Sequence, residues 1–147
     1  MKQNQIAEIS ISYTPSRYNQ AKILSTQDAY DVLKEFFARE TISLQEQFVV
    51  MYLNSCQNIL GIYKASKGGI TGTVADIRLI LGVALKSASI SFIIAHNHPS
   101  GNLQPSLADE MITKKLKDAA ELLEVNLLDH LIVSDTGFYS FADEGKM

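Results

Sequence analysis

The sequence predicts an α/β layered domain in which a mixed β-sheet is flanked by helices. Segments with helical spacing of apolar residues alternate with short β-rich runs along the chain. One pair of β-rich runs is separated by a short polar turn, which favours antiparallel pairing, while the helical segments can connect parallel strands. The 147 residues are about the length of one domain, and 46% hydrophobic residues are enough for a sizeable core.

Residues 1–25 are expected to form an N-terminal strand and a connecting arm. Ile9, Ile11 and Tyr13 alternate with serines, which is the period-two pattern of a half-buried strand, and Pro15 ends the pattern. This would be an edge strand, and pairing between the edges of two molecules would give a homodimer.

The main domain, residues 26–147, is expected to begin with a helix that starts at Ser25 or Thr26 and ends near Glu40. Its apolar residues recur at helical spacing: Ala29, Tyr30, Leu33, Phe36 and Phe37.

A β-hairpin and a second helix follow. The β-rich runs at residues 48–53 and 59–63 flank a polar turn that contains Cys56, the single cysteine, which cannot form an internal disulfide. The second helix is predicted from Val74 to near Ser87. Its apolar face comprises Ile77, Ile80, Leu81, Ala84 and Leu85.

The remaining chain is predicted to contain three strands and one helix. A buried strand is expected at residues 90–95, a helix from Ser106 to about Glu124, and strands at 127–133 and 138–141. The core-facing residues of this third helix are predicted to be Ile112, Leu116, Ala119, Ala120 and Leu123.

Charge and hydropathy exclude several classes of protein. The net charge of −3 lacks the positive footprint of a dedicated nucleic-acid binder. No apolar run approaches the ~20 residues needed to span a bilayer, and the N-terminus has no signal-peptide core. We therefore expect a cytoplasmic protein that does not bind membranes.

Two histidines separated by one residue follow the buried strand. His96 and His98 emerge where that strand ends and can share one ion, and Pro99 and Gly101 shape the turn after them. Catalytic zinc commonly has three protein ligands, including imidazole nitrogens and carboxylate oxygens, and one water. The third ligand is therefore expected among four acidic residues: Asp109, Glu110, Asp129 and Asp135.

Helical spacing favours Asp109 as the third ligand. Asp109 shares a face with the core-facing Ile112 and Leu116. The opposite face is predicted to be exposed and to carry Glu110, Thr113, Lys114 and Lys117. Glu110 is accordingly expected to form an exposed ion pair with Lys114.

Ser106 and Asp109 also have the spacing of a helix capping box. Ser106 can cap the third helix, whereas coordination by Asp109 would compete with capping, so we expect Asp109 to be a ligand and not a cap. A zinc-bound water with a pKa of ~7 still needs a base. Glu46 is the candidate, because it directly precedes the strand at residues 48–53.

Three further polar residues have alternative interpretations. Asn97, between the histidines, is expected to turn its amide toward the backbone of the histidine loop. Asp129 and His130 interrupt an apolar strand and could hold a ligand imidazole, but a buried histidine is more often a hydrogen-bonded core residue. His130 is therefore left outside the predicted catalytic set.

These residues resemble a known motif. Glu46, His96-Asn97-His98, Ser106 and Asp109 fill every position of the JAMM motif of the MPN, or JAB, metallopeptidases, Glu followed by His-x-His-x7-Ser-x2-Asp. The flanking sequence is similar to the RadC-like JAB proteins in four places: the histidine loop to Gly101, Pro105-Ser106, residues 127–133 and residues 139–145. The resemblance implies a JAB/MPN-like (cytidine-deaminase-like) fold.

The resemblance also implies a reaction. His96, His98 and Asp109 would bind Zn²⁺, Glu46 would act as general acid/base, and Ser106 would donate a hydrogen bond to the oxyanion of the tetrahedral intermediate. The implied activity is hydrolysis of a peptide or isopeptide bond in a protein or peptide substrate.

Three other functions agree less well with the sequence. A catalytically silent interaction domain is an alternative, although the intact Glu46 argues against it. A DNA-repair role is suggested by the RadC label, but the acidic charge and the missing helix-hairpin-helix region make DNA binding a poor expectation. A zinc deaminase fits poorly, because no Pro-Cys-x-x-Cys follows the histidines.

Overall fold

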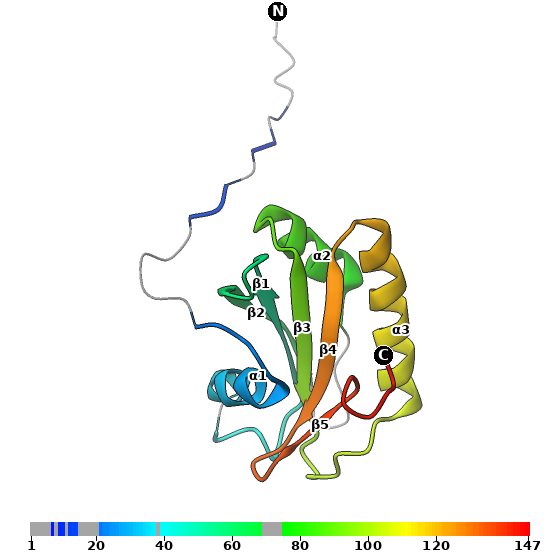
Figure 1. The fold of residues 1–147 in the computed structure, drawn as a ribbon. Coiled ribbons are helices and arrows are strands. Elements are labelled where there is room, and N and C mark those ends of the chain that lie inside the picture. Colours follow the sequence, from blue (N-terminus) through cyan, green and yellow to red (C-terminus); the bar gives the residue numbers. More distant parts are fainter. Residues whose placement is uncertain (1–6, 8, 11, 15–20, 38, 69–74) are drawn as a thin grey trace, which may run out of the picture.

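The computed structural model describes residues 7, 9–10, 12–14, 21–37, 39–68 and 75–147 and contains a five-stranded sheet with the order β2-β1-β3-β4-β5 (Figure 1). The strands are β1 (Gln47–Leu53), β2 (Ile59–Lys67), β3 (Ser91–Asn97), β4 (Asn126–Val133) and β5 (Phe138–Ser140). The helices are α1 (Thr26–Leu33), the short 3-10 helix η1 (Lys34–Phe36), α2 (Ile77–Lys86) and α3 (Leu107–Leu122).

The sheet is mixed, as predicted. β1 pairs antiparallel with both β2 and β3, and β4 pairs antiparallel with β5. The central pair, β3 and β4, is parallel, with α3 as the crossover between them. The chain therefore leaves the C-terminal end of β3, forms a loop and enters the N-terminal end of α3 at the same end of the sheet, where the two histidines lie.

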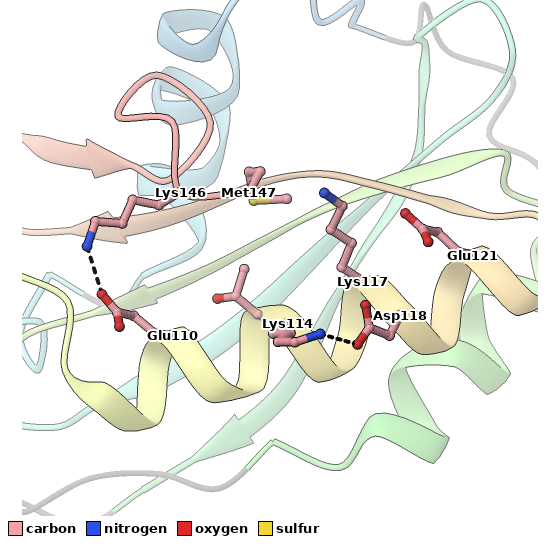
Figure 2. A pocket seen from close by; sticks show the side chains of 8 residues that line it. Glu110, Lys114, Lys117, Asp118, Glu121, Lys146 and Met147 are labelled. Atoms are coloured by element: carbon pink, nitrogen blue, oxygen red, sulfur yellow. Dashed lines mark hydrogen bonds and ion pairs between the residues drawn. The ribbon is translucent and has the colours of Figure 1, made fainter.

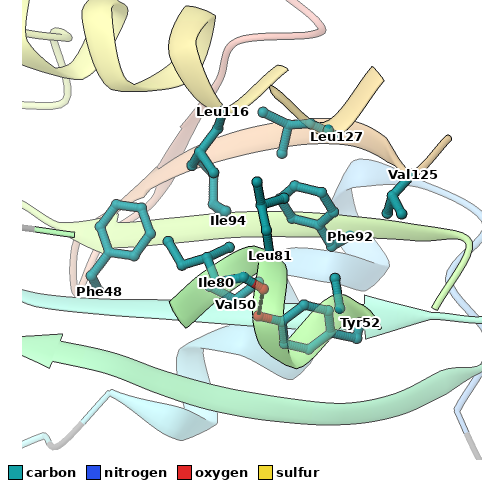
Figure 3. Close-up of a cluster of buried hydrophobic side chains, with 12 residues drawn as sticks. Phe48, Val50, Tyr52, Ile80, Leu81, Phe92, Ile94, Leu116, Val125 and Leu127 are labelled. Carbon is teal, nitrogen blue, oxygen red and sulfur yellow. Dashed lines mark hydrogen bonds between the residues drawn. The ribbon is translucent and has the colours of Figure 1, made fainter. Parts of the chain in front are cut away.

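Helices cover both faces of the sheet. Even-numbered residues of β1 and β3, such as Phe48 and Ile94, pack with α2 and α3 in one core cluster. This cluster includes Leu116 of α3 (Figure 3). Odd-numbered residues such as Val49 and Ala95 pack with α1 in a second cluster. Because both faces are covered, β1 and β3 are buried along their whole length, which explains their continuous apolar runs.

The structure confirms most of the predicted elements. The hairpin, the second and third helices and the three later strands all form close to their expected positions. The first helix is shorter than predicted, because the chain becomes extended at Phe37. This turn buries Phe37 at 2% exposure and leaves Phe36 38% exposed, whereas a continued helix was expected to bury both.

Three predictions about the surface are wrong. Ile9, Ser10, Ser12 and Tyr13 are assigned to no strand, and Ile9 is 91% exposed; Ile11 and Pro15 lie outside the described residues. Leu85 and Leu123, at the C-terminal ends of α2 and α3, are both exposed, whereas Ala84 and Ala120 of the same helices fill the core. Within the described ranges, no helix has both the length and the apolar character to cross a membrane.

Candidate metal centre

Three side chains meet where β3 ends and α3 begins. His96 Nε2 lies 2.9 Å from His98 Nε2 and 3.1 Å from Asp109 Oδ1, and Asp109 Oδ2 lies 3.3 Å from His98 Nε2. In the described part of the chain, this is the one group of at least three potential ligands with all ligand atoms within 4.8 Å of one another. The structure thus brings together the three residues predicted to bind zinc.

The donor set fits a zinc ion. His98 Nδ1 lies 2.6 Å from the carbonyl oxygen of Asn102, and because a carbonyl only accepts, Nδ1 carries the hydrogen and leaves the Nε2 lone pair toward the cluster. Two imidazole nitrogens and one carboxylate are ligands that catalytic zinc sites use. The loop after His98 turns as predicted: Gly101 has φ 79° and donates its N–H to the His98 carbonyl oxygen.

Asp109 is both part of this cluster and part of a helix cap. Its Oδ2 accepts the Ser106 backbone N–H at 2.7 Å, and Ser106 Oγ accepts the Asp109 backbone N–H at 3.1 Å, which is a complete capping box. The expectation that Asp109 would not act as a cap is therefore wrong. A carboxylate has lone pairs on two oxygens, so Oδ2 can accept from Ser106 while Oδ1 faces His96.

In the metal-free protein, the contacts within the cluster shift the pKa values of Asp109 and His98 in opposite directions. Burial works to raise the pKa of Asp109, but the neighbouring His96 and His98 and the Ser106 backbone N–H outweigh it and hold that pKa well below its usual range. The hydrogen bond with Asp109 raises the pKa of His98 in turn. A proton and a metal cation would therefore compete for His98 Nε2.

The other predicted carboxylate ligands are directed elsewhere. Glu110 forms an ion pair with Lys146 at 2.9 Å and not with Lys114, because the C-terminal segment returns over α3 (Figure 2). A cavity lined mainly by charged side chains lies at this position. Lys114 pairs with Asp118 instead. Asp129 is buried and accepts three hydrogen bonds from β4 and from the segment at residues 140–142, and Asp135 is exposed in the turn between β4 and β5.

Glu46, the predicted base, lies beside the cluster of His96, His98 and Asp109 without joining it. Its Oε1 is 4.0 Å from His96 Nε2, and its side chain is 19% exposed. Burial raises the pKa of Glu46, and His96 and His98 partly offset the effect. A raised pKa suits a group that must take up a proton and release it near neutral pH.

Asn97 fixes the backbone on both sides of Glu46. Its Nδ2 donates to the carbonyl oxygens of Ile42 and Gln45 at 2.7 and 2.9 Å, and its Oδ1 accepts the Gln47 N–H at 2.7 Å. The prediction that this amide turns toward the histidine loop is wrong, because side chains alternate along β3 and Asn97 points to the face opposite His96. It reaches the segment before β1 instead.

A cavity of about 240 Å³ opens directly on the cluster. Its polar side is formed by Glu46, His96 and Asp109, and the remaining lining is apolar: Phe48, Ala75, Ala108 and Ile112. A substrate that enters this cavity would contact the reactive side chains on one side and apolar side chains on the other.

Two residues at the site were not in the predicted set. His130 of β4 is fully buried, its Nε2 lies 2.8 Å from His96 Nδ1, and its Nδ1 lies 2.6 Å from Thr113 Oγ1. The prediction that Thr113 faces solvent is wrong, because it is 2% exposed. The i, i+4 relation of Thr113 to Asp109 on α3 was the signal that could have placed it on the same face.

Comparison with known proteins gives a consistent result. A family model described as RadC-like JAB domain matches residues 23–146. A UPF0758 protein of Flavobacterium johnsoniae is 44% identical over 124 residues, which is 84% of this chain and 53% of the relative. A UPF0758 protein of Porphyromonas gingivalis is 40% identical over 126 residues, 85% of this chain and 54% of the relative. The chain thus spans about half the length of these curated relatives.

Proposed function

The chain belongs to the RadC-like JAB domain family, and from this membership and the geometry of the site we propose that it is a zinc-dependent metallohydrolase that cleaves a peptide or isopeptide bond. The observation that carries the proposal is the position of Glu46, whose carboxylate lies 4.0 Å from His96 Nε2 but outside the cluster of His96, His98 and Asp109. A hydrolytic metal site needs both a set of ligands and a separate base.

His96, His98 and Asp109 would hold the metal. When bound, a zinc ion supplies Lewis-acid chemistry: it lowers the pKa of a water molecule and polarises the carbonyl group of the scissile bond. All other steps are assigned to side chains of this chain.

Glu46 would take the proton from the attacking water and deliver it to the leaving amine. Its carboxylate faces the cavity beside His96, and its burial raises its pKa above the ordinary value, which favours the uptake of a proton. Asn97 would hold the backbone around Glu46 in place during this transfer.

Ser106 would stabilise the oxyanion that forms on the substrate carbonyl. In the capping box its oxygen accepts the Asp109 N–H, which uses a lone pair and leaves the hydroxyl hydrogen for another acceptor. Capping and donation to an oxyanion are therefore compatible in one side chain.

The apolar lining of the cavity supports an uncharged part of a protein or peptide as the group beside the scissile bond. Phe48, Ala108 and Ile112 offer no partner for a charged side chain. For the whole protein we further propose a cytoplasmic location, no binding to DNA and assembly into a homodimer.

The metal part of the proposal is tested by measuring zinc in the full chain after equilibration with Zn²⁺ and removal of free ion. We expect one zinc per chain, lost in His96→Ala. A wild-type chain that retains no zinc overturns the proposal.

The hydrolytic part is tested on a library of fluorogenic peptides that includes isopeptide-linked members. Glu46→Gln is expected to keep its zinc and to lose activity by about 10²-fold or more. Glu40→Gln, the same change in a nearby acid that does not line the cavity, is the matched control. Equal activity of wild type and Glu46→Gln overturns the role of Glu46, and a zinc-loaded wild type that cleaves no member favours an interaction domain.

A further inference from the structure

We propose that Thr113 and His130 form a buried hydrogen-bond chain that fixes the tautomer of His96, so that the His96 Nε2 lone pair faces the metal site. The chain runs from Asp109 in α3 through Thr113 in α3 and His130 in β4 to His96 in β3. The inference rests on the proposed zinc site, and it assigns positioning roles to two residues that are outside the JAMM motif.

The direction of these hydrogen bonds is determined at the α3 end of the network. Thr113 Oγ1 lies 2.6 Å from the Asp109 carbonyl oxygen, which can only accept a hydrogen bond. If the Thr113 hydroxyl hydrogen pointed elsewhere, two oxygen acceptors would face each other at this distance. The hydroxyl therefore donates to Asp109 and has only lone pairs left for its second partner.

That second partner is His130. Because Thr113 Oγ1 accepts, the facing His130 Nδ1 at 2.6 Å must carry a hydrogen. His130 is fully buried and stacked on Phe141, with ring centroids 4.6 Å apart and planes inclined by 11°, so an uncompensated positive charge on its ring is disfavoured. A neutral His130 with a hydrogen on Nδ1 has a lone pair on Nε2.

The last step determines the state of the ligand. His130 Nε2 accepts from His96 Nδ1 at 2.8 Å, so the hydrogen of a neutral His96 lies on Nδ1 and its Nε2 is free to bind a cation. If these hydrogen bonds ran in the opposite direction, His96 would present an Nε2–H to His98 and Asp109, and this hydrogen would block the metal site. The direction of one threonine hydroxyl thus determines whether His96 can be a ligand.

The same tautomer of His98 is favoured more directly, because its Nδ1 forms a hydrogen bond to the Asn102 carbonyl oxygen. The buried His96 instead meets a side chain at Nδ1, and it is connected to a carbonyl oxygen through His130 and Thr113. The carbonyl at the end of its chain belongs to Asp109, so the network also connects the two elements that carry the ligands. Partners of this kind commonly change metal affinity by about 10- to 100-fold when removed.

The experiment measures Zn²⁺ affinity of the full chain by competition with a chromophoric chelator. Thr113→Val keeps the shape of the side chain but removes the hydroxyl, and we expect about a 10-fold loss of affinity. Thr113→Ser retains the hydroxyl and is expected to restore wild-type affinity. Ser89→Ala removes another buried hydroxyl, which donates to Ala84 at the other end of the sheet, and is the matched control.

A second measurement needs no variant. Nitrogen-15 NMR of the histidine rings in the wild-type chain is expected to show the hydrogen of His130 on Nδ1, with or without zinc. A hydrogen on Nε2 of His130, or equal zinc affinity of wild type and Thr113→Val, overturns the inference. A wild type that binds no zinc overturns the proposed function instead, and the NMR result still decides the direction of the chain.

Discussion

The Asn97 side chain accepts the backbone N–H of Gln47 at 2.7 Å, across 50 positions of sequence. Asn97 lies between the two histidines of the proposed metal site in sequence, and Gln47 directly follows the proposed base. One buried amide therefore joins the ligand strand to the segment that carries Glu46, and it is 0% exposed with three hydrogen bonds.

We predict that Asn97→Ala lowers both stability and activity. It leaves a buried N–H and two carbonyl groups without their partner, which is expected to cost about 2–4 kcal/mol in the free energy of unfolding. Urea denaturation measures this cost. Asn54→Ala removes two hydrogen bonds in the exposed turn of the hairpin and is expected to cost about 1 kcal/mol or less. Equal effects of the two substitutions would contradict the role of Asn97.

The two roles of Ser106 can be separated by substitution. Ser106→Asn retains a side-chain oxygen suited to capping but replaces the hydroxyl, so stability is expected to stay near wild type while hydrolysis falls by about 10²-fold. Ser25→Ala, at the cap of α1, is the control: it is expected to lose about 1 kcal/mol of stability without loss of activity. If Ser106→Asn keeps full activity, Ser106 serves only as a cap.

Zinc affinity is expected to depend on pH through His98. Its pKa in the metal-free protein is raised above the ordinary value of about 6.5 by the hydrogen bond with Asp109, so competition by protons begins above that value as pH falls. Below the raised pKa, the apparent binding constant should fall about tenfold per pH unit, because one proton must leave Nε2 for each ion bound. Asp109 adds no proton competition near neutrality, since its pKa lies well below its usual range. Chelator competition between pH 6 and pH 8 measures the slope, and a flat profile contradicts the prediction.

Asp129 is expected to support the site from a distance. Its carboxylate accepts from Ser140 Oγ at 2.6 Å and from the backbone N–H groups of Ala142 and His130, which holds Phe141 against the His130 ring. Asp129→Ala leaves these donors unpaired, and we expect a loss of about 2–4 kcal/mol in unfolding free energy together with weaker zinc binding. Asp129→Asn, which keeps an oxygen for the two N–H groups, is expected to lose about 1 kcal/mol or less. Thermal unfolding and chelator competition on both variants check this.

The sequence was most informative where a local pattern determines the structure. The α2 and β3 segments could be located from periodicity, and the spacing of Asp109 from Ile112 and Leu116 placed it toward the cluster at the start of α3. The assignments of zinc, of Glu46 as base and of Ser106 as oxyanion donor stay predictions, because the geometry is compatible with them without testing them.

Errors arose where distant segments meet. The pairing of Glu110 with Lys146 is not visible in the spacing of one helix. That spacing could place Thr113 on the same face as Asp109, but it does not reveal the contact of Thr113 with His130 of β4. His130 has the sequence pattern of a core histidine in an apolar strand, because nothing in its sequence neighbours reveals that β4 lies beside β3. The N-terminal serine alternation has a strand period, but the described residues Ile9 and Tyr13 have no partner strand.

The ligands and the base come from different ranges of the chain, and this has a consequence for the order of folding. His96, His98 and Asp109 all lie within residues 96–109, so a single short loop closure gathers them at small entropic cost. Glu46 arrives only when β1 has paired with β3, a contact between distant segments that forms late in typical folding reactions. If the proposed function holds, a folding chain acquires its affinity for a cation first and its ability to cleave a bond last, so that partly folded molecules would not hydrolyse the proteins around them.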